Sequence, residues 1–137
     1  MKIKLTDSEW AILEHRLDLT DCLAECYADT AFADAEREGK TMTDEQHKAA
    51  YEMAEAAADK LRSKISTTRE ISANTLTELD KWFLTDCMEG STFFCGLDDA
   101  VWDGELTKGK VLSLRKAGHS LQRKLNEAGI EGSMCWD

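Results

Sequence analysis

The stretch that decides the fold is residues 43–65, which read TDEQHKAAYEMAEAAADKLRSKI. It opens with a capping box, in which the Thr43 hydroxyl accepts from the backbone of Gln46 while the Gln46 side chain reaches back. Apolar residues then recur at helical spacing and give the helix an inner face: Ala50, Met53, Ala54, Ala57, Leu61 and Ile65. The many alanines on this face predict that another helix packs closely against it.

The rest of the chain extends this helical pattern, and none of its 137 residues is Pro. Further helices are predicted from Asp7 to about Glu38 with a bend at 18–21, from Ser72 or Asn74 to about Glu89, over the short segment 97–102, and from Thr107 to Ala128. Residues 66–68 are predicted as a turn, and the alternation in residues 2–5 predicts a short strand. We therefore expect one mainly α domain over residues 1–137: a compact bundle of four to five helices. A short β element is expected from the N-terminal, 92–95 and C-terminal segments.

Composition narrows the classes of function. The chain carries 27 acidic against 17 basic residues, a net charge of −10, and 42% of its residues are hydrophobic. This apolar fraction is too high for a disordered chain, and no apolar run approaches the roughly 20 residues of a membrane span. A charge of −10 disfavours attraction to nucleic acid or to anionic lipid. We expect neither direct nucleic-acid binding nor membrane binding.

The five cysteines form no C-x-x-C pair and follow no secretory signal, so we expect a reducing, cytoplasmic setting. His15, Cys22 and Cys26 share one face of the first predicted helix and offer three soft ligands for zinc. The alternative is that Cys26 is a small core residue. Because structural zinc sites place ligand pairs on turns, we expect no metal and no cofactor.

The charge is unevenly distributed along the chain. Residues 7–38 and residues 70–105 each carry a net charge of −8, whereas residues 106–124 carry +6 and contain no acid. Seven acids of the first segment fall on one helical face, opposite its apolar residues: Asp7 and the six predicted binding residues Glu14, Asp18, Asp21, Glu25, Asp29 and Glu36.

Like charges three or four residues apart destabilise a helix by a few tenths of a kcal/mol per pair, and no Lys or Arg of the first predicted helix relieves this face. The face is therefore predicted to bind a partner. The alternative is a solvated face that keeps the protein in solution.

The second acidic segment ends in a loop that contains Asp98, Asp99, Asp103 and Glu105 around Trp102. These carboxylates are predicted to extend the negative surface, with Trp102 as an apolar anchor for a partner. Such a cluster is also suited to Mg²⁺ or Ca²⁺, but the stretch lacks the alternating carboxylates of an EF-hand loop.

The last predicted helix carries a basic face, formed by Lys108, Arg115, Lys116, His119 and Arg123. We interpret it as pairing with acids of another helix, or with the acidic face of a second copy. Phosphate contact is an alternative, but no neighbouring aromatic stacking platform is evident in the sequence.

No catalytic signature surrounds His15, His47 or His119, so we do not expect an enzyme. Cys87 or Cys95 with a distant His, or paired carboxylates, leave a small enzyme as an alternative. Size, acidity and predicted helicity resemble the small acidic inhibitors encoded by phages and plasmids, which include anti-CRISPR and DNA-mimic proteins. The resemblance is one of composition and no motif carries it.

It implies a stoichiometric inhibitor, in the cytoplasm of a bacterial host, whose acidic surface occupies the basic nucleic-acid-binding surface of a protein or nucleoprotein such as a CRISPR effector complex. The alternative is a regulatory or adaptor domain that binds through an apolar groove. Monomer and homodimer both remain open.

Overall fold

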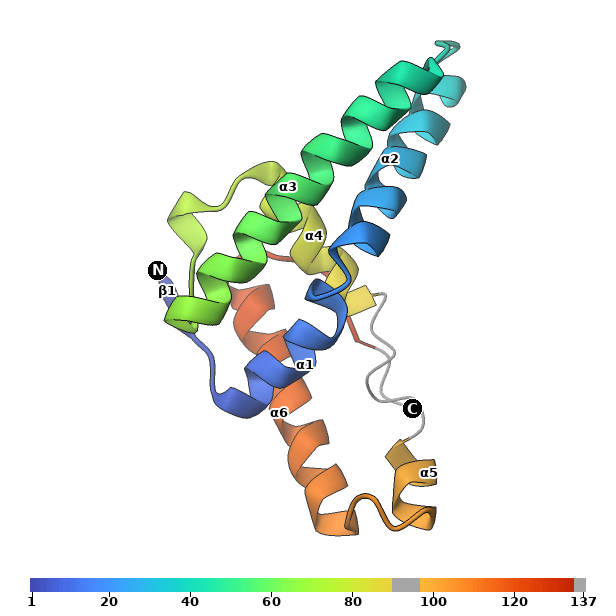
Figure 1. Ribbon diagram of the computed structural model, residues 1–137. Helices are drawn as coiled ribbons and strands as arrows, with labels where there is room; N and C mark the ends of the chain where they lie inside the picture. Colours follow the sequence, from blue (N-terminus) through green and yellow to red (C-terminus); the bar gives the residue numbers. More distant parts are fainter. Residues whose placement is uncertain (90–96, 135–137) are drawn as a thin grey trace.

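The chain is mainly α-helical, as predicted (Figure 1). The computed structural model describes residues 1–89 and 97–134. In chain order the elements are β1 (Lys2–Lys4), α1 (Asp7–Leu17), α2 (Thr20–Arg37), α3 (Asp44–Thr68), β2 (Glu70–Ser72), the 3₁₀ turn η1 (Ala73–Thr75), α4 (Glu78–Glu89), α5 (Leu97–Trp102) and α6 (Lys108–Glu127).

The first predicted helix breaks in two at the bend expected in residues 18–21. Asp18 still donates to the carbonyl of Glu14, but Leu19 donates to Arg16, three residues back, and its ψ of 61° leaves the helical region. No side chain caps the start of α2. The direction of the chain changes here, so the acidic face is carried by two helices rather than one.

Both predicted capping boxes form. Thr6 and Glu9 exchange hydrogen bonds of 2.9 and 3.1 Å at the start of α1, and Thr43 with Gln46 does the same at the start of α3. The inner face of α3 is close to the prediction, since Ala54, Leu61 and Ile65 are buried together with Ala58. Met53 was predicted wrongly: it is 48% exposed, because no third helix covers this part of the pair.

The turn predicted for residues 66–68 is wrong, because α3 continues to Thr68. The Thr68 hydroxyl donates to the carbonyl of Lys64, which satisfies this polar side chain within the helix. Arg69 then adopts a left-handed conformation with φ of 55° and ends the helix.

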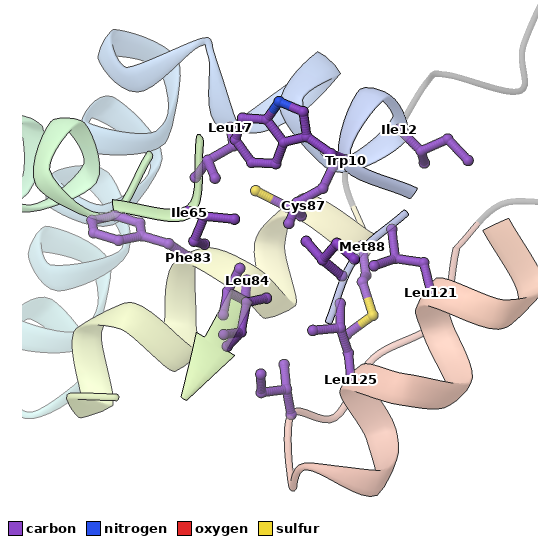
Figure 2. Packing of buried hydrophobic residues seen from close by; sticks show 14 of the residues in the cluster. Trp10, Ile12, Leu17, Ile65, Phe83, Leu84, Cys87, Met88, Leu121 and Leu125 are labelled. Atoms are coloured by element: carbon purple, nitrogen blue, oxygen red, sulfur yellow. The ribbon is translucent and has the colours of Figure 1, made fainter. Parts of the chain in front are cut away.

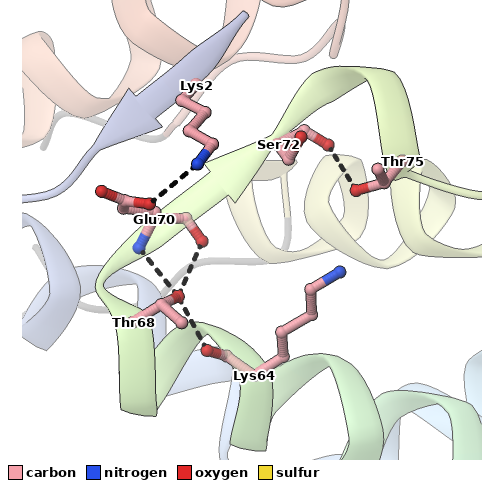
Figure 3. A network of polar contacts seen from close by, with 6 residues as sticks. All are labelled: Lys2, Lys64, Thr68, Glu70, Ser72 and Thr75. Atoms are coloured by element: carbon pink, nitrogen blue, oxygen red, sulfur yellow. Dashed lines mark hydrogen bonds and ion pairs between the residues drawn. The ribbon is translucent and has the colours of Figure 1, made fainter.

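Residues 70–72 form a strand that the sequence did not reveal. β2 pairs antiparallel with β1, with Ile3 opposite Ile71, and the Thr68 hydroxyl and the Lys2–Glu70 ion pair of 4.0 Å lie at its start (Figure 3). The expected start of a helix at Ser72 or Asn74 is therefore wrong, and α4 begins at Glu78. The other segments expected in a β element, 92–95 and the extreme C-terminus, lie outside the described residues.

The core lies where α1, α4 and α6 meet beneath α3 (Figure 2). Its fully buried side chains include Leu17 from α1, Phe83 and Leu84 from α4, and Leu121 and Leu125 from α6. The apolar stripe predicted for the last helix is confirmed at these last two residues and at Val111 and Leu114. We call this part of the molecule the body.

The antiparallel pair of α2 and α3 projects from the body (Figure 1). Close to the body the two helices meet through buried alanines, namely Ala24 and Ala28 on α2 with Ala54 and Ala58 on α3. Between residues 29 and 53 no side chain is buried. We call this outer part of the pair the tip, and no third helix of the described residues covers it.

Candidate functional site

The predicted acidic face belongs to a larger feature, the acidic hairpin, which we define as residues 20–59. It holds eleven acids and three basic residues, a net charge of −8. The acids are Asp21, Glu25, Asp29, Asp34, Glu36, Glu38, Asp44, Glu45, Glu52, Glu55 and Asp59. The three bases pair locally with acids of the same hairpin: Arg37 with Asp34, Lys40 with Glu38 at 3.3 Å, and Lys48 with Glu52 at 4.0 Å.

Glu14 and Asp18 lie at the base of the hairpin and are partly neutralised. The Arg62 guanidinium from α3 lies 2.6 Å from Asp18 and 4.0 Å from Glu14. Further out, His47 of α3 lies 2.9 Å from Asp29. The first predicted helix lacks basic residues on this face, but α3 supplies two partners across the hairpin.

Asp21, Glu25 and Glu36 are exposed, and none of them forms an ion pair with the residues that the structure describes. Asp21 and Glu25 lie near Tyr51 of α3. The Tyr51 hydroxyl donates to Glu55 at 2.9 Å, and this bond, together with burial and the nearby Asp21 and Glu25, raises the pKa of Tyr51. Glu55 is thus a member of the face that sequence analysis missed. Glu52, Glu55 and Asp59 are three and four residues apart, and this helical spacing could have revealed Glu55 from the sequence.

The second acidic segment does not join this face. α5 packs on α6, at the end of the molecule opposite the hairpin tip (Figure 1). Asp98 and Asp99 lie in α5, and Asp103 and Glu105 follow it, the last three being exposed. The two predicted acidic sites are therefore separate surfaces.

Trp102 is 88% exposed, as an anchor residue would be. It lines a groove between α5 and α6 together with Lys108 and Arg115. An aromatic side chain thus stands next to the basic helix, where the sequence offered no sign of one.

One base of α6 pairs within the body. Lys124 lies 2.7 Å from Glu9, which is only 1% exposed, and also donates to the Lys4 carbonyl. Burial raises the pKa of Glu9, but the hydrogen bonds from Lys124 and Thr6 outweigh it and leave this pKa below its usual value. Arg123 lies 3.8 Å from Glu127 on the same helix. Lys124 therefore fixes α6 to α1 and β1.

The residues considered for zinc are not brought together. His15 lies on α1, whereas Cys22 and Cys26 follow the break on α2. Within residues 1–89 and 97–134 no group of three or more His, Cys, Asp or Glu side chains is placed to hold a metal ion. The Cys26 sulfur instead lies 3.9 Å from the Arg16 guanidinium, which pairs with Asp86 at 3.2 Å.

The cysteines also bear on the enzyme alternative. Burial raises the pKa of Cys87 far above its usual value, so this thiol does not supply a thiolate at neutral pH. Cys95 lies outside the described residues. Cys87 is therefore not a candidate nucleophile.

No protein-family model, curated protein or solved structure matches this chain. None of the helices described is long and apolar enough to cross a membrane.

Proposed function

We propose that this protein is a stoichiometric inhibitor that lays its acidic hairpin on a basic, nucleic-acid-binding surface of a partner such as a bacterial CRISPR effector complex. The observation that carries the proposal is the net charge of −8 on a projecting pair of helices, whose tip buries no side chain. Complementary charge of this kind accelerates association and fixes the orientation of the complex.

The charge density of the hairpin supports this class of partner. α2 has 18 residues and is about 27 Å long at 1.5 Å per residue. Eight excess charges over this length amount to one per roughly 3.4 Å, the phosphate spacing along one strand of a duplex. The hairpin therefore offers a nucleic-acid-binding surface about the same density of negative charge as a nucleic-acid strand does.

The projection of the hairpin also supports an inhibitor. A pair of helices that stands clear of the body reaches into a channel that a globular body does not enter. In such a channel the carboxylates of the hairpin occupy the positions of the nucleic-acid phosphates. The channel is then blocked, and the partner has no nucleic acid to act on. Because CRISPR effector complexes act inside bacterial cells, the proposal also implies the cytoplasm of a bacterial host.

The test compares two variants with the same change in charge. The first reverses Asp21, Glu25 and Glu36 to Lys; these acids have no ion pair in the described structure, so no such pair is lost. The matched control reverses Asp99, Asp103 and Glu105 to Lys at the other end of the molecule. Circular dichroism establishes that both variants retain the helical fold.

Binding of target DNA by purified CRISPR effector complexes is then measured with each protein added. We expect the native protein and the control to block DNA binding and the hairpin variant to lose the block. Equal inhibition by all three proteins would contradict the proposal, and equal loss in both variants would point to bulk charge instead of the hairpin.

A further inference from the structure

The groove between α5 and α6 exposes two large apolar side chains to solvent. Its volume is about 670 Å³, and its apolar lining comes from Val101, Trp102, Val111 and Leu112. Trp102 is 88% exposed and Leu112 is 69% exposed. Neighbouring exposed apolar side chains at a groove with a polar rim are typical of an interaction site.

The charges around this groove are balanced, and they are divided between the two helices. Residues 97–116 hold four acids and four bases, so this segment is neutral in a chain whose net charge is −10. All four acids lie in α5 or in the turn that follows it, and all four bases lie in α6. Two copies of the chain can therefore approach each other here without the repulsion that two acidic hairpins meet.

On the α6 side, lysines flank the exposed leucine. Lys108 and Lys116 lie four residues before and after Leu112, so the three side chains share one side of the helix. Lys108 also lines the groove. Arg115 lines it too, but this side chain already interacts within the chain, so the bases available to an occupant are the two lysines.

On the α5 side, aspartates flank the exposed tryptophan. Asp99 lies three residues before Trp102, on the same side of this helix, and Asp103 follows Trp102 directly. Both aspartates and both lysines are exposed, and none of the four forms an ion pair with residues 1–89 or 97–134. The groove thus has acids beside one apolar side chain and bases beside the other.

We propose that this groove binds the same groove of a second copy and so forms a homodimer with twofold symmetry. A surface with acids on one side and bases on the other is complementary to itself when the twofold axis runs along the groove. α5 of each copy then lies against α6 of the other. Trp102 packs on Leu112 of the second copy, and the two aspartates face its two lysines, twice in each dimer.

The dimer is independent of the proposed function, because the hairpin tip lies at the opposite end of the molecule and stays uncovered (Figure 1). Each dimer therefore carries two free acidic hairpins. A partner with two basic sites within reach is then bound more tightly by the dimer than by a single chain.

The test is the mass of the native chain in solution, measured by sedimentation from about 1 to 500 μM, a range that reports micromolar dissociation constants. Since two exposed apolar side chains per copy make a small interface, we expect a dissociation constant of about 10–100 μM at about 0.15 M salt. Trp102→Ala removes the larger apolar contact and should weaken the dimer at least about tenfold. The circular dichroism of this variant should not change, because the fold does not bury Trp102.

Charge reversal distinguishes this dimer from other modes of association. Lys108→Glu with Lys116→Glu makes both sides of the groove acidic, and Asp99→Lys with Asp103→Lys makes both sides basic. Each double variant alone should be monomeric, whereas an equimolar mixture of the two should form a heterodimer. Bulk attraction does not explain this result, because the net charges are −14 and −6, four units on either side of −10.

Lys40→Glu with Lys48→Glu is the matched control. It changes the net charge by as much as the double variant of α6, but both lysines lie in the acidic hairpin, so it should dimerise as the native chain does.

Three results would overturn the inference. One is a native chain that stays monomeric up to the highest concentration. Another is a dimer that Trp102→Ala does not weaken. The third is a pair of folded double variants that fail to associate when they are mixed.

Discussion

The body and the hairpin tip differ in what holds them together. In the body, Leu17, Phe83 and Leu121 are fully buried where α1, α4 and α6 meet. In the tip, residues 29–53, two helices touch along half-buried side chains, and none of these residues is buried. Because hydrophobic burial supplies most of the stability of a fold, the body carries the stability and leaves the tip available for contact.

Charges follow the same division. Two ion pairs of the body join distant elements, namely Lys124 with Glu9 and Arg16 with Asp86. The hairpin concentrates acids and pairs its few bases locally. The cost of like-charge repulsion is therefore borne by the part of the molecule that contributes least to the core.

The largest expected loss of stability comes from shortening a buried side chain in the body. Leu17→Ala removes a side chain that is 0% exposed, and we expect it to lower the free energy of unfolding by about 2–5 kcal/mol. Leu112→Ala, at a residue that is 69% exposed, is the matched control and should change it by no more than about 0.5 kcal/mol. Urea unfolding measures both, and similar losses would show that the division into body and exposed surface is wrong.

Amide hydrogen exchange tests the division without a mutation. We expect amides near Phe32 and Ala49 in the tip to exchange on the order of 100-fold faster than those near Phe83 and Leu121, through local opening. The physical reason is the absence of buried side chains between residues 29 and 53. Equal protection of the tip and the body would contradict it.

The ion pair between Glu9 and Lys124 should matter less than the core and more than any pair on the hairpin. Lys124→Met leaves the buried Glu9 carboxylate without this hydrogen-bond donor, and we expect a loss of about 1–3 kcal/mol. Chemical denaturation at pH 7 measures this loss. An unchanged stability would mean that the pair does not fix α6 to α1.

The same pair has a pH dependence of known sign. The folded pKa of Glu9 lies below its usual value, so ionised Glu9 stabilises the fold above the unfolded pKa of about 4.3. This contribution is lost as the pH falls through the lower folded pKa. The difference in stability between the native chain and Glu9→Gln should therefore shrink below about pH 4.

Local patterns were predictable from the sequence. Both capping boxes, the break near Asp18 and the buried stripe of the last helix depend on spacings within one segment. Strand β2 was not predicted, because residues 66–68 resemble a turn, Ser72 resembles a helix cap, and the partner strand lies near the N-terminus.

The candidate site was predictable only in part, for the same reason. The acids of α2 follow from helical spacing, but Arg62 and His47 reach them only after the hairpin folds. The place of Trp102 beside Lys108 likewise depends on how α5 packs on α6. A contact between two elements cannot be read from the residue spacing within either of them.

The smallest expected effect is a gain in stability. Glu25→Lys replaces an acid that lies four residues from both Asp21 and Asp29, so we expect a stabilisation of a few tenths of a kcal/mol. Thermal unfolding at low salt measures it, and the gain should fade as salt is added. A destabilised variant would mean that the acidic hairpin carries no repulsive cost.

The central claim is that the acidic hairpin binds a basic surface. Its most direct test is the salt dependence of the affinity for a purified effector complex, measured by calorimetry for the native chain, for the hairpin variant with Asp21, Glu25 and Glu36 reversed, and for the control with Asp99, Asp103 and Glu105 reversed. We predict that the native chain and the control bind with a steep loss of affinity as salt rises, whereas the hairpin variant loses both the affinity and the steepness. A hairpin variant that binds as tightly as the native chain would contradict the claim.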